Sequence, residues 1–191
     1  MATRNLPLAT PIDRLAAFFD PSQPRERYND AEIDEIAGLL GLCGHIASKC
    51  PRTYIVLRRI DELDVLSRML NEGFSDQWLP IEPRGLPNFL SPSVKARIVQ
   101  TQSIVLTKCL DLEKGRHRHF TPGEVLPFET VGCLGSGGYS QVDHIISKIS
   151  FRHYALKRVR RRVAFGINSK EAMKRFLSEV QIVKDLKQAY R

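Results

Sequence analysis

The glycine-rich segment 135–140 constrains the fold more than any other stretch of the sequence. It lies between two short apolar runs, 131–134 and 141–146, and the second alternates apolar and polar residues as a half-buried strand does. A dinucleotide-binding fold would instead place such a run at the start of a helix. Because glycine allows positive φ and close approach to the backbone, we expect a hairpin whose N–H groups face an anionic ligand.

A lysine and a glutamate downstream strengthen this interpretation. A third strand-like run, 151–159, contains Tyr154-Ala-Leu-Lys157, and a helix that begins with a capping pattern at Asn168 and Glu171 contains Glu179. A lysine inside a strand is costly unless it is paired, and a glutamate on a helix facing the sheet would supply the partner. Together the two side chains can hold the phosphates of a nucleotide.

In this order and spacing, the segment 128–191 resembles the N-terminal lobe of the eukaryotic protein kinases. Leu134-Gly-Ser-Gly-Gly-Tyr-Ser-Gln-Val142 resembles the glycine-rich loop, and Tyr154-Ala-Leu-Lys157 resembles the V-A-I-K strand. Phe176-Leu-Ser-Glu179 and the residues up to Leu186 resemble helix αC. A wider run, from Leu106-Thr-Lys to the glycine loop, is similar to kinases of filamentous fungi.

The resemblance implies an α+β fold, with a helical N-terminal region followed by antiparallel strands and an αC-like helix. It implies ATP as the ligand and Lys157 with Glu179 as the catalytic pair. The residues that it places against ATP are Leu134, Gly135, Ser136, Gly137, Gly138, Tyr139, Ser140, Val142, Ala155 and Lys157. Two positions depart from the family pattern, because Ser140 replaces the third glycine and Asp143 puts an acid beside the loop. Strand alternation from Val142 predicts that Asp143 points away from the phosphates.

The implied activity is that of a serine/threonine protein kinase, a transferase that moves the γ-phosphoryl of ATP to a protein hydroxyl. Serine or threonine is preferred to tyrosine only because it is the commoner substrate in the family. The motifs H-R-D-x-x-x-x-N, D-F-G and A-P-E do not occur in the 191 residues. Mg²⁺ is expected in the complete kinase, but its ligands are absent here. We therefore expect a catalytically incomplete fragment, truncated product or gene-model error. The alternative is a non-catalytic nucleotide-binding or scaffold protein.

The N-terminal two thirds of the chain has helical periodicity. The sequence as a whole predicts four segments: a leader at 1–29, a helical region at 30–112, a linker at 113–125 and the truncated kinase lobe at 126–191. Within the helical region, a candidate module for a protein partner, we expect helices over 31–48, 51–70 (closed by Gly73) and 91–110. Trp78 is expected to be a core anchor. The basic loop 115–119 is expected to be a solvated surface loop rather than a phosphate or metal contact.

Composition limits the other functions. The formal net charge is +8, and 148–191 alone carries +10, from thirteen Lys or Arg and three acids. Such a basic segment suits nucleotides or nucleic acids, but the run 157–162 lacks the aromatic residues of a nucleic-acid site. No apolar stretch is long enough to span a membrane, and no secretory signal is present, which favours the cytoplasm or the nucleus. No metal site is expected, because Cys109, His117, His119 and Cys133 match no structural zinc spacing.

Overall fold

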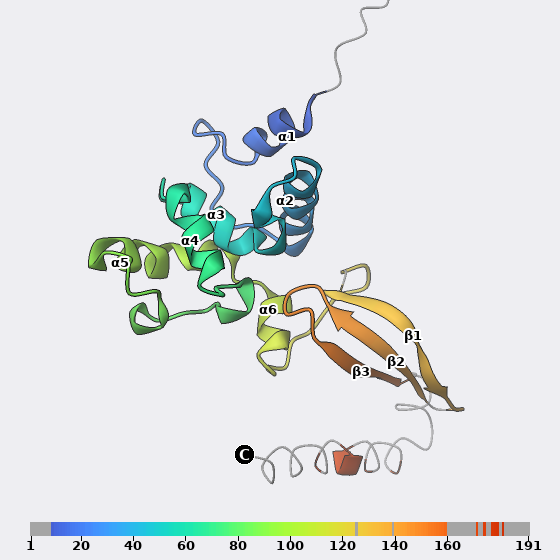
Figure 1. Cartoon of the computed structure of the whole chain (residues 1–191). Coiled ribbons are helices and arrows are strands. Elements are labelled where there is room, and N and C mark those ends of the chain that lie inside the picture. The colour runs from blue at the N-terminus through green and yellow to red at the C-terminus, as the bar shows by residue number, and fades with distance from the viewer. Residues whose placement is uncertain are drawn as a thin grey trace, which may run out of the picture. The chain divides into compact units, whose positions relative to one another are not determined.

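The structure is a computed structural model, and it describes residues 9–124, 126–138 and 140–159, together with 171, 174, 177–179 and 181. The chain divides into two compact units, Met1–Pro127 and Phe128–Arg191. The first unit contains the helices α1 (Pro11–Ala17), α2 (Asp30–Leu42), α3 (Pro51–Arg59), α4 (Leu66–Asn71), α5 (Pro92–Thr101) and α6 (Lys108–Glu113) (Figure 1). Short 3₁₀ turns lie among them, at Ile46–Lys49, Leu63–Val65, Asp76–Trp78, Pro83–Gly85 and Gln102–Val105.

Helix α2 is shorter than the segment 31–48 that periodicity predicts. Its apolar face is as expected, with Ile33, Ile36 and Leu40 buried. The helix nevertheless ends at Leu42, because Gly44 takes a positive φ of 65° and His45 N donates to Leu40 O at 2.8 Å. These are the features of a glycine-terminated helix. The predicted helix over 31–48 was too long because periodicity does not reveal the turn at Gly44.

The predicted helix over 51–70 is two helices. Helix α3 ends at Arg59, and the chain then turns through Asp61, whose φ is 58°. Helix α4 starts at Leu66 and is closed by Gly73, which has the positive φ expected of a residue after a helix end. The break was not foreseen because Asp61 is not a residue type that marks a helix end as strongly as glycine does.

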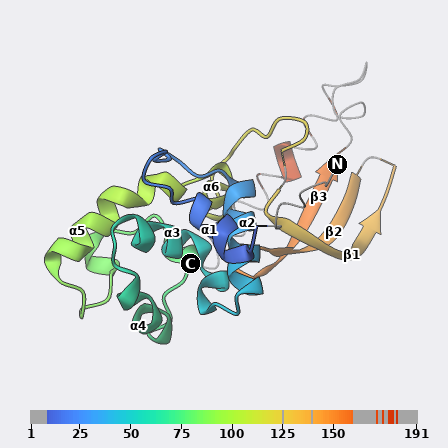
Figure 2. The same cartoon turned by 90° about the horizontal axis from the view of Figure 1, so that it is seen from above.

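Helix α3 is the central helix of the first unit, and it contacts α2, α4 and α5 (Figures 1 and 2). Its residues from Arg52 to Leu57 are all buried. A helix that is buried on every side must satisfy its polar groups within the protein.

A distant carboxylate satisfies the first turn of α3. The preceding residue Cys50 makes no side-chain cap, but Asp76 accepts hydrogen bonds from Arg52 N at 2.8 Å and from Thr53 N at 2.8 Å. The Thr53 hydroxyl also donates to Asp76, at 2.7 Å. Burial raises the pKa of Asp76, whereas the bonds from Thr53 and the charge of Arg52 oppose that rise. Asp76 thus caps α3 from a loop that follows α4.

The last predicted helix is also interrupted. Ser91 caps α5 as expected, by accepting from Val94 N at 3.3 Å. Instead of continuing to residue 110, the chain leaves α5 at Thr101 and starts α6 at Lys108.

The prediction that Trp78 is a core anchor is wrong. Its side chain is not in the core, since the residue is 47% exposed and stacks on the buried Phe74.

The second unit contains a three-stranded antiparallel sheet in the order β1 (Phe128–Ser136), β2 (Ser140–Ser147) and β3 (His153–Val159) (Figure 1). The described residues between 171 and 181 are helical. Helices and a small antiparallel sheet together make the chain α+β, as predicted. In the part of the chain that the structure describes, no helix is long and apolar enough to cross a membrane.

The capping role of Asp76 can be tested by Asp76→Ala. The variant loses the cap of α3 and leaves buried donors without an acceptor, so the free energy of unfolding should fall by about 1–3 kcal/mol. The measurement is the urea midpoint, followed by circular dichroism. The control is Asp64→Ala, at an exposed position. Equal midpoints for the two variants would show that α3 does not depend on this carboxylate.

Candidate nucleotide site

The pairing of β2 with β3 brings the predicted nucleotide-contacting residues to one face of the sheet. Val142 lies opposite Lys157, and His144 lies opposite Ala155. Directly opposed residues of an antiparallel pair project to the same face, and residues two apart on one strand do as well. Val142, Ala155 and Lys157 therefore share a face.

The glycine-rich hairpin closes the end of the sheet next to that face. Ser136 pairs with Gln141, and Gly137 N donates to Ser140 O at 2.8 Å. Gly135 pairs with Val142, while Leu134 lies at an irregularity between Cys133 and Gly135 and is 62% exposed. Tyr139 lies outside the described residues.

None of the hairpin glycines uses the left-handed region, which corrects the expectation of positive φ. A Cβ added at Gly135 or Gly138 would meet no atom within 4 Å, and one at Gly137 would meet only Ser140 O, at 3.9 Å. Neither backbone conformation nor packing among the described residues therefore requires glycine here. The three glycines leave open space in front of the backbone, so that an anionic ligand could approach the backbone closely.

Ser140, which replaces the third glycine of the family pattern, fits its position. It begins β2 and pairs with Val159. Its backbone is therefore extended, a conformation that a residue with a side chain adopts readily.

Lys157 is paired with Glu179, since its ammonium group donates to Glu179 Oε2. The lysine side chain is 43% exposed and the glutamate side chain 55%. Lys157 lies inside β3 and is paired, as expected, but it is not buried, and an exposed pair of this kind contributes only about 0–1 kcal/mol to stability. Its relevance is geometric, because it fixes the ammonium group on the face of Val142 and Ala155.

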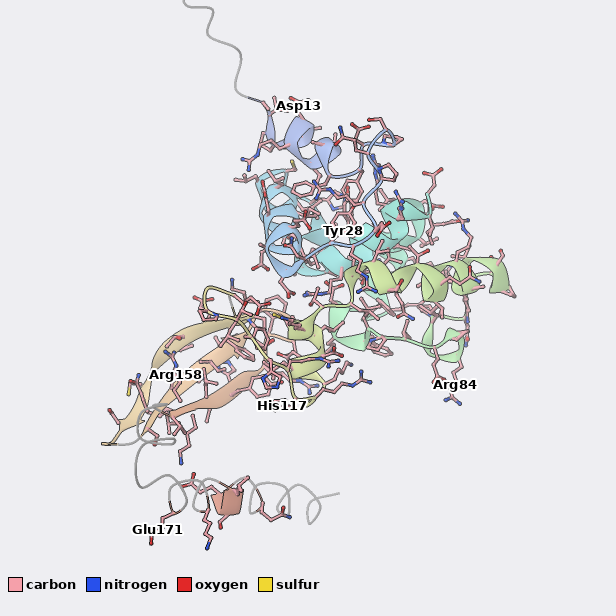
Figure 3. The ribbon with its side chains drawn as sticks, turned by 180° about the vertical axis from the view of Figure 1, so that it is seen from behind. Asp13, Tyr28, Arg84, His117, Arg158 and Glu171 are labelled. Atoms are coloured by element: carbon pink, nitrogen blue, oxygen red, sulfur yellow. The ribbon has the colours of Figure 1, made fainter. Side chains whose placement is uncertain are left out.

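Asp143 lies on the opposite face of the sheet from Val142, as strand alternation predicts. Its residue is 1% exposed, and Gln141 Nε2 donates to its Oδ1 at 2.6 Å. Arg158 Nε lies 2.9 Å from Oδ2, close enough for an ion pair but not aligned as a hydrogen bond (Figure 3 labels Arg158). The negative charge of Asp143 is therefore compensated on its own face and does not oppose an anion beside Lys157.

Two histidines on the Lys157 face were missed by the sequence reasoning. His144 Nε2 and His153 Nδ1 are 2.7 Å apart, and the two rings stack with centroids 4.9 Å apart. One ring donates and the other accepts in this contact. Aligning the two strands of the β2–β3 hairpin in the sequence could have found the pair.

The described residues contain no group of three or more His, Cys, Asp or Glu side chains that could hold a metal ion. The site as described is therefore a cationic side chain, a glycine hairpin and two small apolar side chains. Such an arrangement can bind an anion that carries a flat apolar group.

Comparison with known proteins does not extend this description. No protein-family model, no curated protein and no solved structure matches the chain.

The hairpin can be tested by Gly137→Val. A valine side chain would fill the open space in front of the backbone, so affinity for ATP should fall by about tenfold or more through lost hydrogen bonds. Titration with a fluorescent ATP analogue measures the change. Gly132→Val is the matched control, because its Cβ also meets no atom within 4 Å but lies in β1 outside the hairpin. Equal affinities for both variants would mean that the hairpin is only a turn.

Proposed function

We propose that the chain carries the ATP-binding portion of a serine/threonine protein kinase. The observation that supports this most directly is the pairing of Val142 with Lys157, which places Ala155 and Lys157 on one face beside the glycine hairpin. The pairing of Lys157 with Glu179 adds the second charged residue that the kinase resemblance implies.

Each residue of the site has a role in this proposal. The backbone N–H groups of Gly135, Gly137 and Gly138 would face the phosphates, where no Cβ restricts their approach. Val142 and Ala155 would contact the adenine. Lys157 would bind the α- and β-phosphates while Glu179 holds its ammonium group in place.

ATP supplies the γ-phosphoryl group, which a complete kinase transfers to a serine or threonine hydroxyl of a protein substrate. The residues of this chain contribute binding and charge compensation to that reaction rather than proton transfer. Mg²⁺ belongs to the reaction of the family, but the aspartate and asparagine that hold it there have no counterpart among the 191 residues.

One observation favours a second function, a scaffold or interaction protein, for the helical unit. A surface pocket of about 280 Å³ is lined by residues that include Phe74, Trp78 and Pro87, together with the charged Glu72 and Arg84. Trp78 is 47% exposed, although tryptophan is costly to leave in water. An exposed tryptophan in a pocket that also contains charges of both signs is typical of surfaces that bind peptides. This unit is therefore a candidate module for a protein partner.

The nucleotide proposal predicts a specific effect of Lys157→Met. This variant keeps the length of the side chain but removes its charge, so affinity for a fluorescent ATP analogue should fall by about tenfold or more. The control is Arg152→Met, which removes an equal charge from an exposed position in the turn before β3. The control should bind as the unchanged chain does.

If both variants lose affinity equally, binding depends on net charge alone and the assigned role of Lys157 is wrong. If neither the variants nor the unchanged chain binds the analogue, the scaffold interpretation replaces the nucleotide proposal. Circular dichroism of each variant excludes loss of folding as the cause.

The proposal also predicts that the 191-residue chain has no phosphotransferase activity. Its residues would supply only phosphate binding, whereas kinases of the family also need a catalytic aspartate and side chains that hold the metal. Because these groups act as a unit, a chain that lacks some of them should lose nearly all activity. Transfer of labelled phosphate from ATP to a basic protein should equal that of the Lys157→Met chain. Transfer well above this control would show that the chain is catalytically complete.

A further inference from the structure

An exposed threonine follows two arginines in the segment that comes after α6. Thr121 is preceded by Arg118 at the third position and Arg116 at the fifth, and Pro122 follows it. Residues 116–121 have no regular secondary structure, and the side chains of Arg116 and Arg118 are 62% and 41% exposed. Figure 3 labels His117, which lies in this segment.

Such a segment has the properties that a protein kinase needs in a substrate. The acceptor hydroxyl must be accessible, and the chain around it must be free to adopt an extended conformation. Guanidinium groups at fixed positions before the hydroxyl can be recognised by carboxylates of the kinase, because Arg–carboxylate pairs are directional. Arginine-directed kinases use this kind of charge pattern.

Other hydroxyls of the described chain lack one of these properties. Ser91 also precedes a proline, but Asn88 and Leu86 occupy the third and fifth positions before it. Ser178 has an arginine three residues before it, but Met173 occupies the fifth position before it and the residue is helical. Thr121 combines the arginines with an irregular, exposed backbone.

The contacts that hold the segment are weak enough to release. Both arginines pair with Asp111, with Arg118 Nε 2.8 Å from its Oδ2 and Arg116 Nη1 3.3 Å from its Oδ1. Ion pairs between exposed side chains contribute little to stability, so a competing carboxylate can replace Asp111.

The Lys108 ammonium group lies where it could pair with a phosphate on Thr121. Thr121 donates its backbone N–H and its hydroxyl to Glu124 Oε2, the hydroxyl at 2.9 Å, while Lys108 Nζ lies 2.8 Å from Glu124 Oε1. The Thr121 oxygen and the Lys108 ammonium group therefore contact the same carboxylate. A phosphate on Thr121 would repel Glu124 and attract Lys108.

We propose that Thr121 is a phosphorylation site for a separate, arginine-directed protein kinase. Thr121 Oγ1 forms a bond to the γ-phosphorus of ATP, the bond from that phosphorus to the bridging oxygen breaks, and ADP leaves. The hydroxyl proton passes to the catalytic base of the modifying kinase. The phosphate then replaces Glu124 as the partner of Lys108. This proposal does not depend on nucleotide binding by the chain itself.

The test treats the 191-residue chain with ATP, Mg²⁺ and an arginine-directed kinase, in parallel with a proline-directed kinase and with no added kinase. Mass spectrometry locates the phosphate and measures its rate of incorporation. We expect phosphate mainly on Thr121, from the arginine-directed kinase. Arg118→Ala should slow incorporation by about tenfold or more, because it removes a charge-assisted contact. Arg14→Ala, which also removes an exposed arginine that pairs with a carboxylate, should leave the rate unchanged.

The proposal is overturned if phosphate accumulates mainly on Ser91 or Ser178, if Arg118→Ala has no effect, or if only the proline-directed kinase modifies Thr121. Phosphate on Thr121 in the sample without added kinase would also overturn the role of a separate kinase.

A second measurement tests the exchange at Lys108. Hydrogen bonds from Lys108 and Thr121 hold the pKa of Glu124 at about 2. In the phosphorylated chain the bonds from Lys108 and from the Thr121 hydroxyl are lost and a phosphate lies nearby, so the pKa of Glu124 should rise from this low value. Carbon-13 NMR titration of the glutamate carboxyl groups measures the change. An unchanged pKa of Glu124 would show that the phosphate does not displace it.

Discussion

The register between β2 and β3 determines what the second unit can do. Side chains alternate between the faces of a strand, so a slip of one residue would move Lys157 to the face that now holds Asp143. The ammonium group would then lie beside the buried carboxylate, and Arg158 would take its place next to Val142. The present register separates the two charged systems, with Asp143 and Arg158 paired on one face and Lys157 with Glu179 on the other.

The first unit depends on a comparable arrangement of charges at helix ends. Arg52 lies in the first turn of α3, where the helix dipole disfavours a cation. Its guanidinium group pairs with Asp30 at 2.7 Å, and the Thr107 hydroxyl donates to the same carboxylate at 2.7 Å. Asp30 begins α2 and Thr107 caps α6, so one carboxylate links three helix starts. Because Arg52 is buried, removing Asp30 would leave an unpaired charge in the core, which costs more than the pair itself contributes.

Local signals in the sequence identified most elements but not their lengths. The stop at Gly73 was predicted, and the structure confirms it. The cap at Ser91 and the buried face of Ile33 and Leu40 likewise follow from short-range chemistry. The ends at Leu42 and Arg59 depend on turns that tertiary packing selects, so periodicity alone carried the predicted helices too far. Asp76 as the cap of α3 could not be found from spacing, because it is 24 residues away from Arg52.

In the candidate site, too, some features could be predicted from the sequence and others depend on the tertiary structure. The kinase resemblance implied that Val142, Ala155 and Lys157 act together, and strand alternation predicted that Asp143 points to the other face. The exposure of Lys157 and the absence of positive φ at Gly135 and Gly137 could not be read from residue types. These two corrections change the physical account of the site. An exposed ammonium group in a high-dielectric setting gains little from Glu179 alone. In the proposed nucleotide complex, its contribution to binding would come from phosphate charge brought close to it across the open space at the glycines.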